Sequence, residues 1–234
     1  DRLVEAVRSV ADADLDAATR ERDDPSSTRS RSTRSDSDAG TADLDGPLTV
    51  IIAASTGGPN AVERVLSALP MADCRVVIVQ HMPEAFTSRF ADRLDAASAY
   101  DVREASDGAR IGAGEALVAR GGSHTLIDSY RSGRLRVKLD EDDDSHTVTP
   151  AADVTMRSAA EVIDDPLVGV VLTGMGSDAA DGIRAMADAG ARTLAQSEGT
   201  CVIYGMPKRA VETGGVDEVH DLDDVAGAIV GGEA

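Results

Sequence analysis

The sequence is poor in aromatic residues and in lysine. It contains no Trp, two Phe and three Tyr among 234 residues, and its lysines are Lys138 and Lys208. Hydrophobic residues still make up 42% of the chain, so a core can form, but it must be built mainly from aliphatic side chains. No apolar run approaches the roughly 18 residues that a membrane span requires, and no signal peptide is recognisable. These absences favour a cytoplasmic protein that does not insert into a membrane.

Acidic side chains outnumber basic ones by 42 to 23, which gives a net charge of -19 at pH 7. Such a surface repels nucleic acid and anionic lipid, so we expect no nucleic-acid partner. An Asp-rich, Lys-poor composition favours a halophilic protein, in which salt screens the self-repulsion; an acidic protein from ordinary salt is the alternative. Cys74 and Cys201 lie far apart in apolar segments, which indicates buried, reduced thiols.

Composition divides the chain near residue 46. Residues 1–10 carry apolar residues at helical spacing, and residues 12–46 are rich in Ser, Thr, Asp and Arg with almost nothing apolar to bury. We therefore expect 1–46 to be a helix remnant followed by a flexible interdomain linker, and 47–234 to form the folded domain. Because the chain begins with Asp1 rather than Met, we also expect it to be a piece of a longer protein, whose upstream domain is absent from this chain.

From Leu48 onward, short apolar runs alternate with helical segments. Four β-branched runs predict strands buried on both faces, as in a parallel sheet: 48–54, 75–80, 168–174 and 191–196. Helices are expected at 59–68, 84–97, 178–189 and 221–230. Shorter runs between 101 and 139 predict an antiparallel extension with a hairpin: 116–119, 124–127 and 134–139. The predicted fold class is α/β, with a doubly wound, mainly parallel sheet flanked by helices and an antiparallel hairpin extension.

Three polar residues follow three of the predicted strands, at the sheet edge where chemistry gathers in such folds. Ser55 stands at a glycine-rich turn into a helix, and His81 and Asp178 follow two later strands. Singly, each has an ordinary alternative. Ser55 could cap a helix or line a phosphate-binding loop, His81 could be structural, and Asp178 could cap a helix. Together they supply a nucleophile, a base and an orienting carboxylate.

The motifs around these residues closely resemble those of the CheB-type chemotaxis protein-glutamate methylesterases. They are Ser55-Thr56-Gly57-Gly58, Gln80-His81-Met82-Pro83 and Leu172-Thr173-Gly174-Met175-Gly176-Ser177-Asp178. Shorter similarities occur at Phe86-Thr87, Ala195-Gln196, Gly205-Met206-Pro207 and Gly214-Gly215-Val216. The resemblance runs from about Leu48 to the C-terminus. In three places the chain departs from the family: Ala53 and Ala179 replace common glycines, and Gly121-Gly122-Ser123-His124 replaces Gly-Asp-x-His.

The resemblance implies a serine hydrolase that cleaves glutamate γ-methyl esters on the cytoplasmic helices of a methyl-accepting chemoreceptor and releases methanol. It assigns Ser55 as nucleophile, His81 as base and Asp178 as orienting carboxylate, with the backbone N–H groups at Thr56 and Met175 facing the oxyanion. No metal or organic cofactor is implied. The family also deamidates receptor glutamines, and it carries an N-terminal receiver domain served by a histidine kinase, in two-component signalling that adapts chemotaxis.

Other features have ordinary interpretations. His124, His146 and His220 lack the spacing of a metal site. The acidic run 140–144 predicts a solvated hairpin edge, with a cation site as the alternative. Four basic residues are expected to be solvated, with contacts to an acidic receptor helix as the alternative: Arg89, Arg93, Lys208 and Arg209. Rival functions for the whole chain are a phosphate- or nucleotide-binding protein, a small-ester hydrolase and an inactive regulatory relative.

Overall fold

A computed structural model of the chain describes residues 47–70, 73–141 and 146–231. The chain divides into two units, 1–38 and 39–234, and every described residue belongs to the second unit. The expected helix remnant and linker at 1–46 therefore lie outside the described residues, as does most of the acidic run that starts at Asp140.

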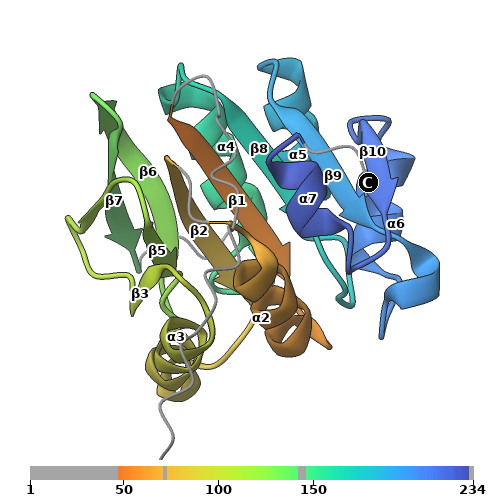
Figure 1. The fold of residues 1–234 in the computed structure, drawn as a ribbon, viewed down its shortest axis with the longest axis horizontal. Coiled ribbons are helices and arrows are strands. Elements are labelled where there is room, and N and C mark those ends of the chain that lie inside the picture. The colour runs from red at the N-terminus through yellow and green to blue at the C-terminus, as the bar shows by residue number, and fades with distance from the viewer. Residues whose placement is uncertain (1–46, 71–72, 142–145, 232–234) are drawn as a thin grey trace, which may run out of the picture. The chain divides into compact units, whose positions relative to one another are not determined.

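Seven strands form one sheet in the order β10-β9-β8-β1-β2-β5-β3, and all neighbouring pairs are parallel (Figure 1). The strands are β1 (Leu48–Ala54), β2 (Cys74–Gln80), β3 (Asp101–Glu104), β5 (Glu115–Val118), β8 (Leu167–Val171), β9 (Arg192–Gln196) and β10 (Glu218–His220). All seven residues of β1 and of β2 are buried, because helices cover both faces of the sheet. The expected parallel, doubly wound sheet is confirmed.

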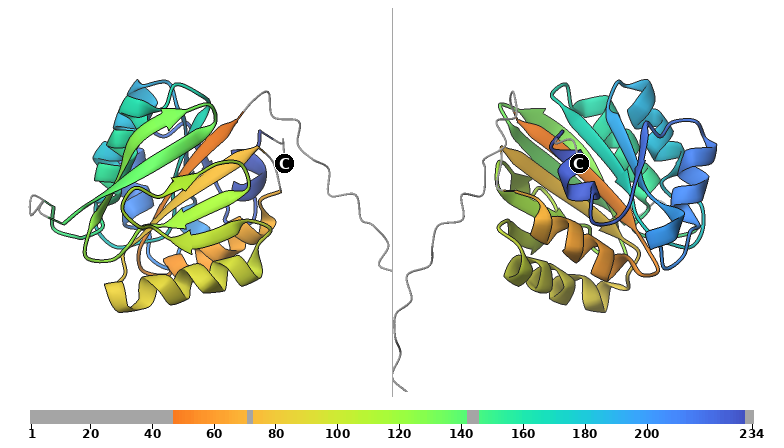
Figure 2. Two further views of the ribbon diagram at one scale, coloured as in Figure 1. Left: turned by 90° about the vertical axis from the view of Figure 1, so that its left-hand side faces the viewer. Right: turned by 45° about the vertical axis from the view of Figure 1, so that its right-hand side comes forward.

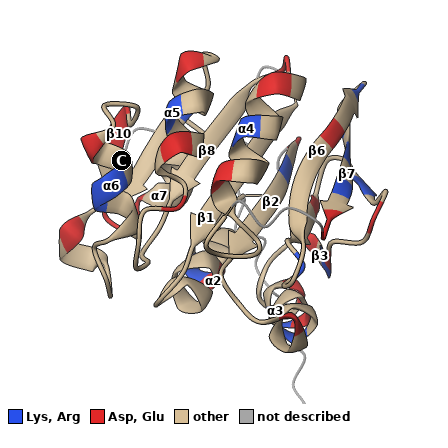
Figure 3. Ribbon diagram, turned by 180° about the vertical axis from the view of Figure 1, so that it is seen from behind, with Lys and Arg blue, Asp and Glu red and all other residues tan. Residues whose placement is uncertain are grey.

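Helices cover both faces of the sheet. On one face, α2 (Gly58–Ala68), α3 (Glu84–Ala97) and α7 (Val225–Ile229) share a core with alternate β1 residues such as Ile52. On the other, α4 (Ala152–Val162), α5 (Ala180–Asp188) and α6 (Met206–Glu212) share a core with Ile51 and Ala53. Figure 1 shows the first set in front of the sheet, and Figure 3 shows α4 and α5 from behind. A short 3-10 turn, η1 (Glu198–Thr200), follows β9.

A second, antiparallel sheet has the order β4-β7-β6 and is seen face-on in the left view of Figure 2. Its strands are β4 (Arg110–Ile111), β6 (His124–Arg131) and β7 (Arg134–Asp140). A two-residue turn, Ser132-Gly133, joins β6 to β7, and both residues have positive φ, as a tight hairpin of this type requires. The predicted hairpin extension is thus confirmed.

The structure corrects several of the predicted elements. Residues 116–119, expected in the antiparallel extension, mostly belong to β5, which is buried between β2 and β3 in the main sheet. The strand expected at 168–174 ends at Val171. The chain then turns, and the Gly174 amide donates a hydrogen bond to the Ile203 carbonyl. The helices expected at 178–189 and 221–230 are shorter, at Ala180–Asp188 and Val225–Ile229.

Across the described parts of the chain, none of the helices combines the length and the apolar character needed to span a bilayer.

Candidate active site

Ser55, His81 and Asp178 follow three adjacent strands of the parallel sheet. The order β8-β1-β2 places β1 in the middle, so Ser55 lies between the chain segments that carry the other two residues. The carboxyl ends of neighbouring parallel strands open at the same edge. We call this edge of the sheet the carboxyl edge.

The register of β1 and β2 brings Ser55 and His81 close together. Ala54 pairs with Gln80 at the last step of the ladder, and the His81 amide donates to the Ala54 carbonyl at 3.0 Å. Ser55 and His81 are each the next residue, so their α-carbons lie about one strand spacing apart, roughly 4.8 Å. On the other side, the Ser55 amide donates to the carbonyl of Thr173 at 3.0 Å, which ties the turn to the loop after β8.

His81 and Asp178 are in direct contact although 97 residues separate them. The imidazole Nε2 lies 2.6 Å from the carboxylate Oδ2, and the side chains are only 13% and 11% exposed. Because Asp178 occupies Nε2, the nitrogen left to accept a proton from a hydroxyl group is Nδ1.

Asp178 is held at the start of α4 as well as by His81. Its Oδ2 accepts the Ala152 amide at 2.6 Å and its Oδ1 accepts the Asp153 amide at 3.1 Å. Burial by itself raises the pKa of Asp178, but the hydrogen bonds from His81 and from these two amides outweigh burial and lower the pKa below 3.8. Asp178 therefore does cap a helix, but the helix is α4 rather than the one that follows it. The carboxylate is ionised at neutral pH.

Glycines let the backbone pack tightly around Ser55. Gly57 has a φ of 82°, which favours glycine, and a β-carbon on Gly58 would lie 2.0 Å from the amide oxygen of Gln80. A β-carbon on Gly174 would come within 2.8 Å of the Ser55 β-carbon. These close approaches explain why the turn motifs contain glycine at these three positions.

Two buried glutamines brace the site, and no role for either had been predicted from the sequence. The Gln80 side chain donates to the Ser55 carbonyl at 2.9 Å and to the His81 carbonyl at 3.1 Å. Gln196 accepts the Thr173 amide at 2.8 Å, and the Thr173 hydroxyl donates to the Thr56 carbonyl at 3.0 Å. Each glutamine ends a strand that is otherwise mainly apolar. Because a buried amide needs fixed hydrogen-bond partners, this position could have indicated a bracing role.

The two residues assigned to the oxyanion lie in the loops that flank Ser55. Thr56 is exposed, and Met175 is 66% exposed. Within the part of the chain that the structure describes, neither backbone N–H donates to another protein group. Both amides are therefore open to a ligand.

The departures from the family motifs differ in how well they suit the fold. Ala53 is fully buried in β1, and Ala179 adopts a φ of 75° just before α5, a conformation that costs an alanine about 1–2 kcal/mol. His124 is buried, and its Nδ1 accepts the Ala151 amide at 3.1 Å, next to the amides that hold Asp178. His124 is thus a structural histidine, as expected.

Several other candidate residues are engaged elsewhere. His220 contacts Glu218, Arg93 contacts Asn60 and Glu63, and Arg209 contacts Glu212.

Among the described residues, no group of three or more His, Cys, Asp and Glu side chains is arranged to hold a metal ion. Cys74 is buried and Cys201 is half-buried, and burial raises the pKa of each thiol to about 11.

Comparison with known proteins identifies relatives of this chain. A relative from Halobacterium salinarum named protein-glutamate methylesterase/protein-glutamine glutaminase is 55% identical over 230 residues, 98% of this chain and 64% of the relative. A relative with the same name from Haloarcula marismortui is 58% identical over 183 residues, 78% of this chain and 50% of the relative. This chain therefore spans less than two thirds of either relative's length.

The crystal structure of the Thermotoga maritima CheB methylesterase catalytic domain has the same fold. It superposes with a TM-score of 0.75 at 34% identity, covering 79% of this chain and 98% of that one. The CheB methylesterase family model matches residues 50–229, the range that contains all three residues of the site. The chain therefore belongs to the CheB methylesterase family.

Proposed function

We propose that this chain hydrolyses γ-methyl esters of glutamate on the cytoplasmic helices of a methyl-accepting chemoreceptor and thereby takes part in chemotaxis adaptation in the cytoplasm. The observation that carries the proposal is the contact between His81 and Asp178 beside Ser55, at the carboxyl edge of β8, β1 and β2. The two relatives named above carry the name of this activity.

In the first half of the reaction, His81 Nδ1 accepts the Ser55 hydroxyl proton while the oxygen attacks the ester carbonyl carbon. The Asp178 carboxylate holds the ring in the required tautomer and stabilises the imidazolium that forms. His81 then gives the proton to the departing methoxide, and methanol leaves a glutamyl ester on Ser55. In the second half, His81 removes a proton from water, and the hydroxide adds to the carbonyl carbon of the glutamyl ester. The bond from that carbon to Ser55 Oγ then breaks, His81 returns its proton to Oγ, and the glutamate carboxylate is released.

The negative oxygen of each tetrahedral intermediate needs donors that are already in place. The open N–H groups of Thr56 and Met175 supply them, from the turn after β1 and the loop after β8. Losing one such donor costs on the order of 100- to 1000-fold in rate. The same steps acting on a glutamine side chain would release ammonia in place of methanol, which is the glutaminase activity in the relatives' name.

The experiment is a methanol-release assay on methylated receptor with the chain and its Ser55→Ala variant. We expect release by the chain and none above background by Ser55→Ala, with an unchanged circular dichroism spectrum. A rival small-ester hydrolase would act on small esters but leave the receptor esters intact. Full methanol release by purified Ser55→Ala protein would refute the proposal.

Regulation is part of the same proposal. We infer that residues 1–46 link the catalytic domain at 47–234 to a receiver domain, which covers the carboxyl edge until a histidine kinase phosphorylates it. The polar, Ser- and Asp-rich composition of 12–46 supports a linker. Methanol release by this chain should then exceed that of the unphosphorylated longer protein, and equal rates would argue against the inference.

A further inference from the structure

Asp153 and Asp178 hold each other's helices by a reciprocal exchange of hydrogen bonds. Asp178 precedes α5 and accepts the amides of Ala152 and Asp153, the first two residues of α4. Asp153, in turn, accepts the Gly182 amide of α5 on its Oδ1 at 2.6 Å. Each carboxylate thus satisfies amides that would otherwise lack a partner at the start of the other helix.

The two helix starts are packed too closely to tolerate much change. A β-carbon at Gly182 would lie 2.7 Å from the β-carbon of Met156 and 3.0 Å from the α-carbon of Asp153. Neither α4 nor α5 has a cap from its own preceding residue, since Ala151 and Ala179 offer no side-chain acceptor. The two carboxylates therefore supply the side-chain caps at both starts and, together with this packing, fix the distance between them.

Asp153 is placed where it acts on the base through Asp178. Its carboxylate sets where α4 begins relative to α5, and the α4 amides set the orientation of Asp178, which contacts His81 at 2.6 Å. If the bond to Gly182 were lost, α4 could move away and Asp178 would lose two of its three donors. The carboxylate could then rotate away from the imidazole.

Burial and the nearby carboxylates disfavour the charged form of the Asp153 carboxylate. Asp153 is partly buried, and burial, followed by repulsion from Asp178 and Asp181, raises its pKa, while the Gly182 amide and Arg157 oppose the rise. A second link between the helices, from Arg157 to the exposed Asp181 at 2.9 Å, touches neither Asp178 nor the amides that hold it.

We propose that Asp153 is a positioning residue of the active site, which fixes the Asp178 carboxylate against His81 by tying the start of α4 to the start of α5. The inference rests on the proposed function and goes beyond it, because it assigns a role to a fourth residue that contacts neither the ester nor His81.

The test compares variants of Asp153 that separate geometry from charge. Asp153→Ala removes the acceptor, Asp153→Asn keeps an oxygen for the Gly182 amide without the charge, and Asp153→Glu keeps the charge but displaces the oxygen by one methylene. The control is Asp181→Ala, which breaks the exposed link between the same helices. The measurements are kcat and KM for methanol release from methylated receptor, with p-nitrophenyl acetate as a substrate that needs no receptor.

We expect kcat to fall by roughly 10- to 100-fold in Asp153→Ala and Asp153→Glu on both substrates, with KM unchanged. Asp153→Asn and Asp181→Ala should stay within about threefold of the unmodified chain. In proton NMR of the free protein, the downfield imidazole N–H signal of His81 should persist in Asp153→Asn and broaden or vanish in Asp153→Glu.

Other outcomes separate the inference from the proposed function. If the unmodified chain releases no methanol, the proposed function fails, while the NMR signal still tests the positioning. If Asp153→Ala does not fold, the Asn and Glu variants decide. The role of Asp153 would be overturned if the Asn and Glu variants had equal kcat values, or if the Glu variant were faster than the Asn variant. It would also be overturned if Asp181→Ala lost as much kcat as Asp153→Glu.

Discussion

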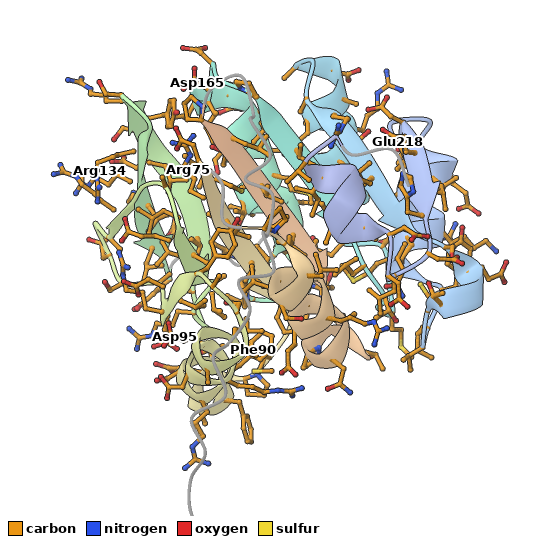
Figure 4. All side chains as sticks on the ribbon, in the orientation of Figure 1. Arg75, Phe90, Asp95, Arg134, Asp165 and Glu218 are labelled. Atoms are coloured by element: carbon orange, nitrogen blue, oxygen red, sulfur yellow. The ribbon has the colours of Figure 1, made fainter. Side chains whose placement is uncertain are left out.

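The two edges of the parallel sheet use polar groups in different ways. At the carboxyl edge, Ser55, His81 and Asp178 are partly exposed, and the imidazole and the open amides retain positions for a ligand. At the opposite edge, which we call the amino edge, Arg75 of β2 is fully buried. Figure 4 labels Arg75 and Asp165 at this edge, where β1 begins.

The polar groups of the amino edge are turned inward and hold the hairpin against the main sheet. The Arg75 guanidinium donates to the Thr49 hydroxyl at 3.0 Å and to the Gly133 carbonyl at the hairpin turn. It also lies 5.0 Å from the centre of the Tyr130 ring, and the Tyr130 hydroxyl donates to Asp165. Burial and that hydrogen bond raise the pKa of Tyr130 to about 12.

Location at a strand end does not by itself make a polar cluster functional. At the amino edge the bonds join protein groups to one another, so breaking them should cost stability. At the carboxyl edge the groups are partly exposed and keep bonding capacity for a ligand, so removing them should cost rate, whereas the unpaired Nη2 of Arg75 at the amino edge is buried. Substitutions at the amino edge should therefore act mainly on stability, and substitutions of the three proposed catalytic residues mainly on rate.

The largest expected effect is on rate at the carboxyl edge. Asp178→Asn should lower kcat for methanol release by on the order of 10,000-fold, because the amide favours the wrong imidazole tautomer. Steady-state assays on methylated receptor would measure this. A fall of less than about tenfold would show that the carboxyl edge does not depend on this carboxylate.

The same substitution has a pH-dependent effect on stability. The pKa of Asp178 is lowered from 3.8, so the carboxylate contributes stability above that pH, and the contribution is lost as the pH falls through the lowered value. The difference in unfolding free energy between the unmodified chain and Asp178→Asn should be full near neutral pH and shrink below 3.8. Urea denaturation across this range would measure it, and a difference independent of pH would contradict the assigned cause.

The next effect is on stability at the amino edge. Arg75→Met should lower the free energy of unfolding by roughly 3 kcal/mol, because the Thr49 hydroxyl and the Gly133 carbonyl lose a charged donor inside the protein. The kcat for methanol release should stay within about threefold. A large loss of kcat with unchanged stability would abolish the distinction between the two edges.

The smallest expected effect concerns a cation beside the carboxyl edge. Lys208 of α6 is exposed, makes no ion pair among the described residues, and lines a hollow with Gly176 and Ser177 of the loop that carries Asp178. Figure 3 shows basic residues on α6. The alternative interpretation of Lys208, contact with an acidic receptor helix, predicts that Lys208→Gln raises KM for methylated receptor roughly two- to fivefold at low salt, with kcat unchanged.

The only other lysine provides the control. Lys138 is exposed on β7, in the second sheet, so Lys138→Gln should leave KM unchanged. Equal shifts in KM for the two variants would mean that the net charge of the chain, rather than this hollow, governs the effect.

The sequence predicted the centre of the fold better than its periphery. The bounds of β1 were predicted correctly and those of β2 to within one residue, because continuous β-branched runs have few other uses in a globular protein. The helix α4 was missed although its buried residues recur at helical spacing, because Met156 is the only large apolar side chain among the buried Ala152, Thr155, Met156 and Ala159. The place of β5 in the main sheet depends on its partners β2 and β3, which local sequence does not encode.

The three proposed catalytic residues could be located from the sequence because each follows a strand and carries a reactive side chain. The role of Asp153 could not be predicted, since its partners are backbone amides that look alike in every sequence. The same holds for the amides of Ala152 and Asp153, which donate to the Asp178 carboxylate although 25 or more residues separate them from it. Contacts of this kind emerge only when the helices are packed.

The most direct test of the central claim, that Ser55, His81 and Asp178 act as one unit at the carboxyl edge, is labelling with a fluorophosphonate followed by peptide mass spectrometry. We expect one label per chain, on Ser55, formed at least about 100-fold more slowly in His81→Ala. Unchanged labelling of Ser55 in His81→Ala, or a label on a different serine of the native protein, would contradict it.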